Sequence, residues 1–339
     1  MVDQCYRQGE SLGGAFRRLL QEVLSGFEIL FVDPMHPAMR DLAAPFLAEA
    51  LRQAEDLSAA VEVRNRALEA AGYHAQVHWD RQTSFVFLLE DGRRQALKRN
   101  GSSYLLGARK LSADELIGRA GQLSPNALLR PVIQDAMLPT AAYVGGPAEL
   151  AYLAQSEVLY SRLLGRMPVA IPRAGFTLFD ARAAKLVKRY GLGSCPNPLA
   201  DLLAGEDHVR ARIAAKLAPP ELAGSMAAAR ESTARALDRL ATDLVAYDPT
   251  LAAALAKSRR KIEHQLERIE GRIGRETLRR DTRAAADARF LSNLVYPGKH
   301  LQERVYSVLP FLARFGLDLP ARIYEHIQPG CADHQLAIL

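Results

Sequence analysis

Residues 123–149, LSPNALLRPVIQDAMLPTAAYVGGPAE, decide how the first half of the chain folds. The segment contains four prolines: Pro125, Pro131, Pro139 and Pro147. Each proline lacks a backbone N–H donor and fixes φ, so we expect neither a long helix nor a central strand here. Gly145 and Gly146 stand directly before Pro147, whose fixed φ suits the first turn of a helix. The segment is therefore predicted to be a folded loop that leads into a helix over residues 148–164.

Four polar side chains of this segment are candidate ligand-binding groups: Asn126, Arg130, Asp135 and Glu149. Arginine binds a carboxylate through two parallel hydrogen bonds, so Arg130 and the later Arg173 are the predicted carboxylate-binding cations. Asp135 and Glu149 could bind an ammonium group or act as a general base. The glycine pair at the helix start leaves backbone N–H groups free for an anion. Two alternatives stay open: an Arg130–Asp135 ion pair that only orders the loop, and an ordinary loop–helix junction.

The residues before this segment predict an α/β layer. Residues 11–26 place their apolar side chains on one helical face, and the apolar run 28–32 favours a buried strand. A long helical stretch follows over residues 38–71. Helix, strand and helix in this order are typical of half a doubly wound unit. We expect a partial Rossmann-like core over residues 1–180.

A small β meander is predicted as an insertion in this core, over about residues 75–106. Strand-like runs and turn signals mark it: residues 75–79 and 84–89, Asp91-Gly92 and Asn100-Gly101. Ser112, with Glu115 three residues later, predicts a capping box at the start of a short helix. Two more strands are expected at residues 169–171 and 176–179.

Residues 181–335 are predicted to form a separate, all-α coiled-coil domain. One helix carries an a/d seam with Arg259 at the missing position: Leu255, Ile262, Leu266, Ile269 and Ile273. The preceding helix offers a matching face before a turn at residues 247–249: Leu237, Leu240 and Leu244. We expect an antiparallel helical hairpin whose seam closes on its neighbour or on a second subunit. A last helix, residues 301–315, is expected to return to the core.

The length and the net charge of the chain limit the classes of protein to which it can belong. A chain of 339 residues favours about two domains, and its 49% apolar content can fill a sizeable core. The net charge of +6 is modest for this length. Arginines of the predicted hairpin alternate with glutamates at helical pairing distances, and aromatic residues for base stacking are missing there. A solvated helix face is therefore favoured over nucleic-acid binding.

The chain shows no sign of export, of a membrane span or of a metal site. Cys5, Cys195 and Cys331 lie far apart, which argues against a disulfide framework and favours the reducing cytoplasm. The N-terminus lacks the apolar region of a signal peptide, and no apolar run approaches the roughly 20 residues of a membrane helix. His74 and His78 lack a third ligand nearby, so no metal is predicted. Neither of the common glycine-rich nucleotide motifs, Walker A and G-x-G-x-x-G, is present.

A series of short sequence blocks resembles one known family. The blocks are Arg130-Pro131, Gln134-Asp135, Leu138-Pro139-Thr140, Tyr143-Val144-Gly145-Gly146-Pro147 with Glu149, Met167-Pro168, Pro172-Arg173, Phe176-Thr177-Leu178, Pro297-Gly298-Lys299, Leu301-Gln302-Glu303-Arg304-Val305 and Pro310-Phe311-Leu312. In this order, over about residues 9–326, they resemble the cysteine ligase family of bacillithiol biosynthesis, BshC. The resemblance implies a Rossmann-type core with small insertions and a helical coiled-coil domain that forms a homodimer.

The reaction implied by the resemblance joins the carboxyl group of L-cysteine to the amino group of glucosaminyl-malate as an amide. A free carboxylate is unreactive toward amines, so activation by ATP is expected, with cations and backbone donors stabilising the developing oxyanion. The predicted substrate-binding residues are Asn126, Arg130, Asp135, Thr140, Tyr143, Gly145, Gly146, Glu149 and Arg173. Lys299 and Gln302 are the predicted nucleotide contacts, although Lys299 also fits a plain helix start. No catalytic residue is assigned.

The sequence departs from the family's pattern at its beginning. The family's opening strands carry a Thr-Gly-Gln-Gln-x-Gly-Leu type loop and an acidic-His-Asp signature, and neither occurs here. Glu206-Asp207-His208 matches the latter by letters only. We therefore expect the C-terminal portion of a ligase, as a gene fragment or a split subunit that is inactive alone. A non-catalytic dimerising module is the alternative function, and nucleic-acid binding by the Arg-rich helix is a weaker third.

Overall fold

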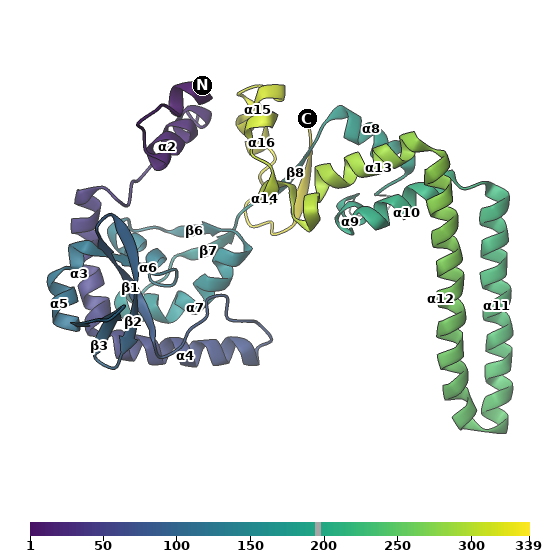
Figure 1. Cartoon of the computed structure of the whole chain (residues 1–339), viewed down its shortest axis with the longest axis horizontal. Helices are drawn as coiled ribbons and strands as arrows, with labels where there is room; N and C mark the ends of the chain where they lie inside the picture. Colours follow the sequence, from purple (N-terminus) through teal and green to yellow (C-terminus); the bar gives the residue numbers. More distant parts are fainter. Residues whose placement is uncertain (194–197) are drawn as a thin grey trace. The chain divides into compact units, whose positions relative to one another are not determined.

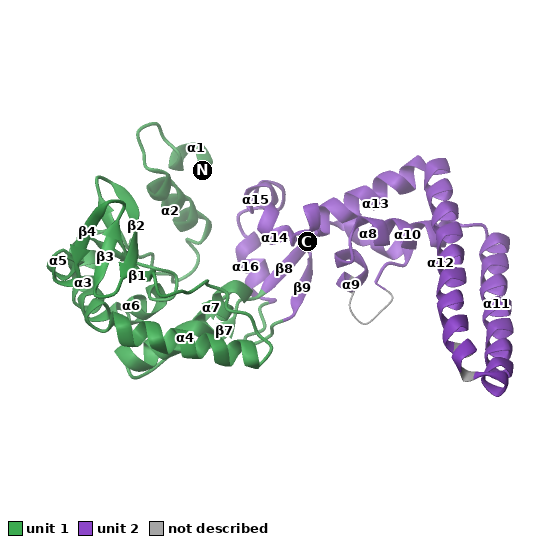
Figure 2. Ribbon diagram, turned by 60° about the horizontal axis from the view of Figure 1, so that its bottom comes forward, with its two compact units in different colours: residues 1–174, 327–332 green, residues 175–326, 333–339 purple. Residues whose placement is uncertain are grey.

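The computed structural model describes residues 1–193 and 198–339, so Cys195 lies outside the described residues. The chain divides into two compact units (Figure 2). Unit 1 comprises Met1–Ala174 and Ile327–Ala332, and unit 2 comprises Gly175–His326 and Asp333–Leu339. The main segment of unit 1 thus ends at Ala174, whereas the sequence analysis placed the end of the core at residue 180.

Unit 1 has helices from its first residues to the end of its main segment. They are α1 (Val2–Cys5), α2 (Leu12–Val23), α3 (Pro37–Arg52), α4 (Ala54–Ala70), α5 (Ala113–Gly118), η1 (Ala120–Gln122), α6 (Arg130–Met137) and α7 (Pro147–Leu163). The predicted helix over residues 38–71 is in fact α3 and α4, which are separated at Gln53. The predicted capping box is confirmed, since Ser112 and Glu115 each bind the other's backbone N–H. The predicted helix start at Pro147 is also confirmed.

An antiparallel sheet of five strands, in the order β4-β3-β2-β1-β5, forms the meander (Figure 1). Its strands are β1 (Thr83–Glu90), β2 (Arg93–Asn100), β3 (Ser103–Leu106), β4 (Arg109–Ser112) and β5 (Leu123–Pro125). Asp91 and Gly92 have φ values of 54° and 71°, the left-handed conformation that a two-residue hairpin turn requires. The predicted meander is therefore present, but its consecutive strands β1 to β4 span residues 83–112 rather than residues 75–106, and β5 pairs with the other edge of β1.

Two predicted strands are wrong. In residues 75–79, the N–H of Val77 donates to Gln155 Oε1 and its carbonyl accepts from Gln155 Nε2, so a side chain replaces a strand partner. Residues 28–32 have no regular secondary structure, and Ile29 and Leu30 are 49% and 79% exposed. A strand is stable only when a neighbouring strand satisfies its backbone groups, and no described strand lies along this run.

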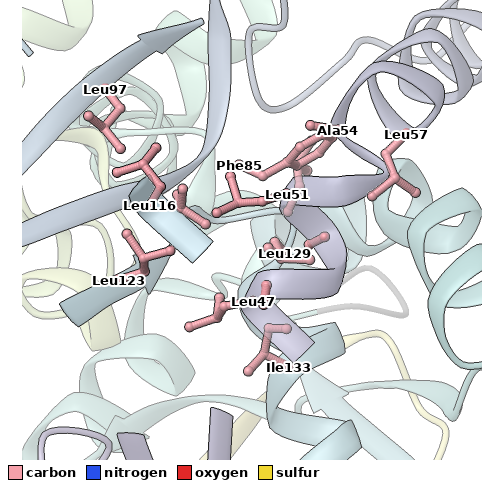
Figure 3. Close-up of a cluster of buried hydrophobic side chains, with 14 of the residues drawn as sticks. Leu47, Leu51, Ala54, Leu57, Phe85, Leu97, Leu116, Leu123, Leu129 and Ile133 are labelled. Atoms are coloured by element: carbon pink, nitrogen blue, oxygen red, sulfur yellow. The ribbon is translucent and has the colours of Figure 1, made fainter. Parts of the chain in front are cut away.

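The core of unit 1 lies between helices α3 and α4, the sheet and α6. Figure 3 shows Leu51 and Leu57 from the helices and Phe85 from β1 within one buried cluster, together with Leu129 of the loop before α6. Leu57 and Leu129 have no exposed area. Burial of side chains of this size contributes roughly 1.5–3 kcal/mol each, which fixes α6 against the sheet.

Strands β6 (Ala142–Gly145) and β7 (Val169–Pro172) pair in parallel, with α7 between them in the chain. Parallel strands require such a crossover connection, and a helix is the usual one. This β-α-β element carries the Rossmann-like character of unit 1. In this element β6 ends at Gly145, just before α7 begins at Pro147.

Unit 2 is mainly helical. Its elements are β8 (Gly175–Phe179), α8 (Ala181–Tyr190), α9 (Pro198–Leu203), α10 (Glu206–Leu217), α11 (Pro220–Tyr247), α12 (Pro249–Arg280), α13 (Thr282–Val295), η2 (Pro297–Lys299), α14 (Gln302–Val305), α15 (Leu309–Phe315), α16 (Leu319–Tyr324) and β9 (His334–Ile338). The prediction of one helix over residues 301–315 is wrong, since Pro310 cannot continue a helix begun at Gln302. The predicted helical domain is otherwise present, and the parallel pair of β8 and β9 is added to it.

Helices α11 and α12 form the predicted antiparallel hairpin (Figure 1). Asp248 caps α12 by accepting from the N–H of Thr250 at 2.8 Å. The two helices are linked by ion pairs, Arg259–Asp238 at 2.6 Å and Arg230–Glu270 at 2.5 Å. One arginine of each helix thus pairs with a carboxylate of the other helix, which supports the interpretation of a solvated charged face.

The predicted seam of α12 divides into two sets of residues. Leu255, Leu266 and Ile273 are half-buried, whereas Ile262 and Ile269 are 38% and 47% exposed. The first set is the more buried of the two, and the second set leaves an apolar stripe on the surface of α12.

A half-buried histidine, His334, lies in the β8–β9 pair. His334 Nε2 lies 2.8 Å from Thr177 Oγ1, and a β-carbon at Gly175 would lie only 2.8 Å from His334 Nδ1. Burial lowers the pKa of His334 below its ordinary value of 6.5, while the nearby Glu303 acts in the opposite direction. The folded chain therefore favours the neutral imidazole.

We expect Leu57→Ala to lower the free energy of unfolding by about 2–5 kcal/mol, because it removes packing and leaves a cavity. Val63 lies on the same helix and is 58% exposed, so Val63→Ala is the control, with a change below about 0.5 kcal/mol. Urea unfolding followed by circular dichroism measures both. Equal effects from the two variants would contradict the assignment of the core.

His334 predicts a loss of stability in mild acid. Its pKa is lowered on folding, so its contribution is complete above pH 6.5 and decreases as the pH falls through the folded value. We expect urea midpoints at about pH 8 and about pH 5.5 to differ less in His334→Gln than in the parent chain. The exposed His326 provides the control variant His326→Gln, whose pH dependence should match the parent. An unchanged difference in His334→Gln would refute this origin.

Candidate functional site

Arg130 begins α6, and tyrosine hydroxyls from two other elements hold its guanidinium group. Its Nη2 donates to Tyr143 Oη at 3.0 Å and to Tyr152 Oη at 2.6 Å. Its Nη1 donates to Gln134 Oε1 at 3.2 Å, one turn along α6. Tyr143 comes from β6 and Tyr152 from α7. Arg130 itself is exposed, so a charged ligand in solvent can reach the guanidinium group.

Glu149 lies on the other side of the Tyr152 hydroxyl. Its Oε2 accepts from the N–H of Gly146 at 2.9 Å, which caps the start of α7. Its Oε1 accepts from Tyr152 Oη at 3.4 Å. Arg130 and Glu149, opposite in charge, therefore contact one hydroxyl group. The site is open, because Arg130 is exposed and Tyr143, Glu149 and Tyr152 are half-buried.

Asp135 pairs with Arg166, and the alternative Arg130–Asp135 pair is not formed. Asp135 is 2% exposed, and its Oδ2 lies 2.9 Å from Arg166 Nη1. Its Oδ1 accepts from the N–H of Thr140 at 2.7 Å and from Thr140 Oγ1 at 2.5 Å. Asp135 and Thr140 thus fix the loop between α6 and β6.

Asn126 is 7% exposed and its side chain binds the backbone. Its Oδ1 accepts from the N–H groups of Leu128 and Leu129 at 3.0 and 2.9 Å, and its Nδ2 donates to the Ser84 carbonyl at 3.1 Å. The amide therefore joins β1 to the residues that start α6. In this structure the Asn126 side chain stabilises the backbone just before Arg130 and is not exposed to solvent.

The glycine pair serves packing and capping. Gly145 is buried, and a β-carbon there would lie 3.1 Å from Glu149 Cβ and 3.3 Å from Leu150 Cδ2. The Gly145 carbonyl accepts from the N–H of Arg173 at 2.8 Å, which extends the β6–β7 pairing. The Arg173 side chain is exposed.

The predicted nucleotide contacts lie in unit 2, whereas the predicted substrate-binding residues lie in unit 1. Lys299 is exposed at the end of η2, with φ 65°. Gln302 is 3% exposed, and its Oε1 accepts from the N–H of Leu178 at 2.8 Å. Its Nε2 donates to the carbonyls of Leu178 and Leu294 at 3.1 and 2.9 Å. The Gln302 amide thus ties β8 to α13.

The sequence analysis missed two tyrosines of α7. Tyr152 contacts both charged groups, and burial, followed by the hydrogen bond shared with Tyr143, raises its pKa to about 12. Tyr160 is fully buried, and its hydroxyl has no hydrogen-bond partner among the described residues. Burial, and then the charge of Asp135, raise its pKa. Tyr152 and Tyr160 are two helical turns apart in the predicted helix, so their shared face was a signal available in the sequence.

No group of three His, Cys, Asp or Glu side chains among the described residues could hold a metal ion. His74 and His78 instead contact Gln76 and Asp80, at 3.2 and 3.7 Å. None of the helices in the described part of the chain is long and apolar enough to cross a membrane.

Comparisons with known proteins match both units to one family. Residues 1–174 match the family model described as the N-terminal Rossmann-like domain of bacillithiol biosynthesis BshC. Residues 176–339 match the model of its C-terminal coiled-coil domain. The expectation of a C-terminal portion only is therefore wrong, since models for the N-terminal and the C-terminal domain both match this chain.

Curated relatives carry the same family name. A protein of Solibacter usitatus named "Putative cysteine ligase BshC" is 52% identical over 339 residues, covering 100% of this chain and 64% of the relative. Proteins of the same name from Koribacter versatilis and Symbiobacterium thermophilum are 35% and 31% identical, over 99% and 94% of this chain and 63% and 59% of their own lengths. The chain thus spans less than two thirds of these relatives. With both units matched by its domain models, the chain belongs to the BshC family of bacillithiol biosynthesis.

Proposed function

We propose that the chain acts as a cysteine ligase, forming an amide bond between the carboxyl group of L-cysteine and the amino group of glucosaminyl-malate. The relatives are named as cysteine ligases, and this supports the reaction class. The observation that carries the proposal for this chain is the contact of Arg130 and Glu149 with one tyrosine hydroxyl.

That arrangement is complementary to a free α-amino acid. Cysteine carries a carboxylate and an ammonium group on the same carbon, so its binding site needs a cation and an anion close together. Arg130 offers the cation: its Nη2 donates to the two tyrosine hydroxyls and its Nη1 to Gln134, and a guanidinium group has five N–H donors in total. Glu149 offers the anion, although one of its oxygens also caps α7. Asp135 is buried and paired with Arg166, so Glu149 is the better candidate for the ammonium group.

Amide formation requires an activated carboxyl group, and we propose ATP as the activating substrate. Lys299 is the proposed phosphate contact, because it is exposed at the end of η2, directly after Gly298. Gln302 is a weaker candidate, since its amide binds the backbone of Leu178 and Leu294. Cys5 and Cys331 are free thiols, which fits a cytoplasmic location.

Homodimerisation through the α11–α12 hairpin is proposed from the apolar stripe on α12. Ile262 and Ile269 belong to the heptad pattern yet are exposed, and a second copy of the hairpin would bury them. The same observation supports the second candidate function, a dimerising module without catalytic activity.

Arg130→Lys should reduce kcat/KM for cysteine by roughly 10- to 100-fold, because lysine has three donors on one atom and cannot hold both tyrosine hydroxyls and a carboxylate in the planar geometry of a guanidinium group. The assay supplies L-cysteine, glucosaminyl-malate and ATP to the purified chain and detects the amide by mass spectrometry. Arg162 is exposed in the last turn of α7 and is not among the described groups that contact Tyr143 or Tyr152, so Arg162→Lys is the matched control. Absence of amide product from the parent chain would refute the ligase proposal for this chain, and equal losses in both variants would refute the role of Arg130.

Ile262→Asp should convert the dimer to a monomer, because it places a charge in the apolar stripe. Light scattering measures the mass of the parent and the variant. Lys257→Asp alters the charge of the same helix at an exposed position outside the seam, and its mass should equal that of the parent. A parent chain that is monomeric, or an Ile262→Asp variant with unchanged mass, would remove this stripe from the proposed interface.

A further inference from the structure

The hydroxyl group of Tyr152 is the only atom described here that contacts both charged groups of the proposed substrate site. It lies 2.6 Å from Arg130 Nη2 and 3.4 Å from Glu149 Oε1. Tyr143 Oη is also 3.4 Å away. Removal of this one oxygen would leave the spacing of Arg130 and Glu149 without a common contact.

The hydrogen-bonding capacities of the three groups fix the direction of the bonds. A guanidinium group only donates and a carboxylate only accepts, whereas a tyrosine hydroxyl does both. Tyr152 therefore accepts from Arg130 and has one hydrogen to give, for which the Glu149 carboxylate is a stronger acceptor than Tyr143 Oη. Because its pKa is raised to about 12, Tyr152 keeps this hydrogen at neutral pH.

Neighbouring residues of α7 hold the backbone of Tyr152 in place through a hydrogen bond and core packing. Ser156, one turn along α7, donates its hydroxyl to the Leu128 carbonyl at 2.8 Å. Leu153, next to Tyr152, is 1% exposed and belongs to the core of unit 1. The position of the Tyr152 ring is thus set by packing between α7 and the start of α6.

We propose that Tyr152 is a positioning residue that sets the spacing of Arg130 and Glu149 for the two charges of an α-amino acid. The proposal rests on the proposed function, in which these two residues bind the carboxylate and the ammonium group of cysteine. Tyr152 acts through both residues and does not itself have to touch the substrate. A ligand with both charges needs the correct spacing, whereas a ligand with one charge does not.

Calorimetric titration of the full chain with three ligands tests this requirement. L-Cysteine carries both charges, 3-mercaptopropionate lacks the ammonium group and cysteamine lacks the carboxylate. In Tyr152→Phe we expect the affinity for L-cysteine to fall about tenfold, the loss of one hydrogen bond between charged partners. The affinities for the two single-charge ligands should change by less than about threefold.

Tyr73→Phe is the control, since Tyr73 is 68% exposed in the same unit and should leave all three affinities unchanged. Urea unfolding of Tyr152→Phe identifies any general loss of structure, which would weaken every ligand alike. Equal losses for all three ligands, no loss for L-cysteine, or a parent chain that does not bind L-cysteine would each overturn the proposal. Selective loss of L-cysteine binding would support it even if the parent chain formed no amide, so the ligase proposal fails or stands separately.

Discussion

The buried amide of Asn126 is the contact on which the proposed site depends. Its oxygen accepts from the N–H groups of Leu128 and Leu129, and its nitrogen donates to the Ser84 carbonyl on β1. These bonds fix the first turn of α6 to the sheet, and Arg130 follows directly. A buried polar side chain in water-free surroundings is costly unless its groups are paired, so the amide holds this geometry firmly. The sequence analysis predicted that Asn126 binds the ligand, whereas in the structure its side chain is buried and binds backbone groups.

The site then forms where three elements meet. α6 supplies Arg130, β6 supplies Tyr143, and α7 supplies Glu149 and Tyr152. The Ser156 bond to the Leu128 carbonyl fixes α7 relative to the segment before α6, and the bond from the Gly146 N–H to Glu149 caps the start of α7. Each charged group is therefore held by bonds that also stabilise the fold, which reduces the conformational entropy lost when a ligand binds.

The apolar seam of α12 in unit 2 contains two sets of residues that differ in exposure. One set of α12 residues is the more buried of the two, and ion pairs such as Arg259–Asp238 line the edge of the hairpin. The other set, Ile262 and Ile269, stays exposed. A heptad pattern does not distinguish these sets, because both positions repeat with the same period.

The sequence by itself determined the local structure: the hairpin turn at Asp91-Gly92, the capping box at Ser112, the helix start at Pro147 and the antiparallel pair α11–α12. The first three depend on residues close together in the chain, and the helical pair follows from two apolar-patterned helices joined by a short turn. The family blocks also led to the correct family. Tertiary structure alone decided whether the apolar run at residues 28–32 pairs as a strand, because a strand needs a partner that propensity does not supply. It likewise decided that Asp135 meets Arg166 and that Arg130 meets Tyr152, since a side chain's partner depends on which distant elements pack beside it.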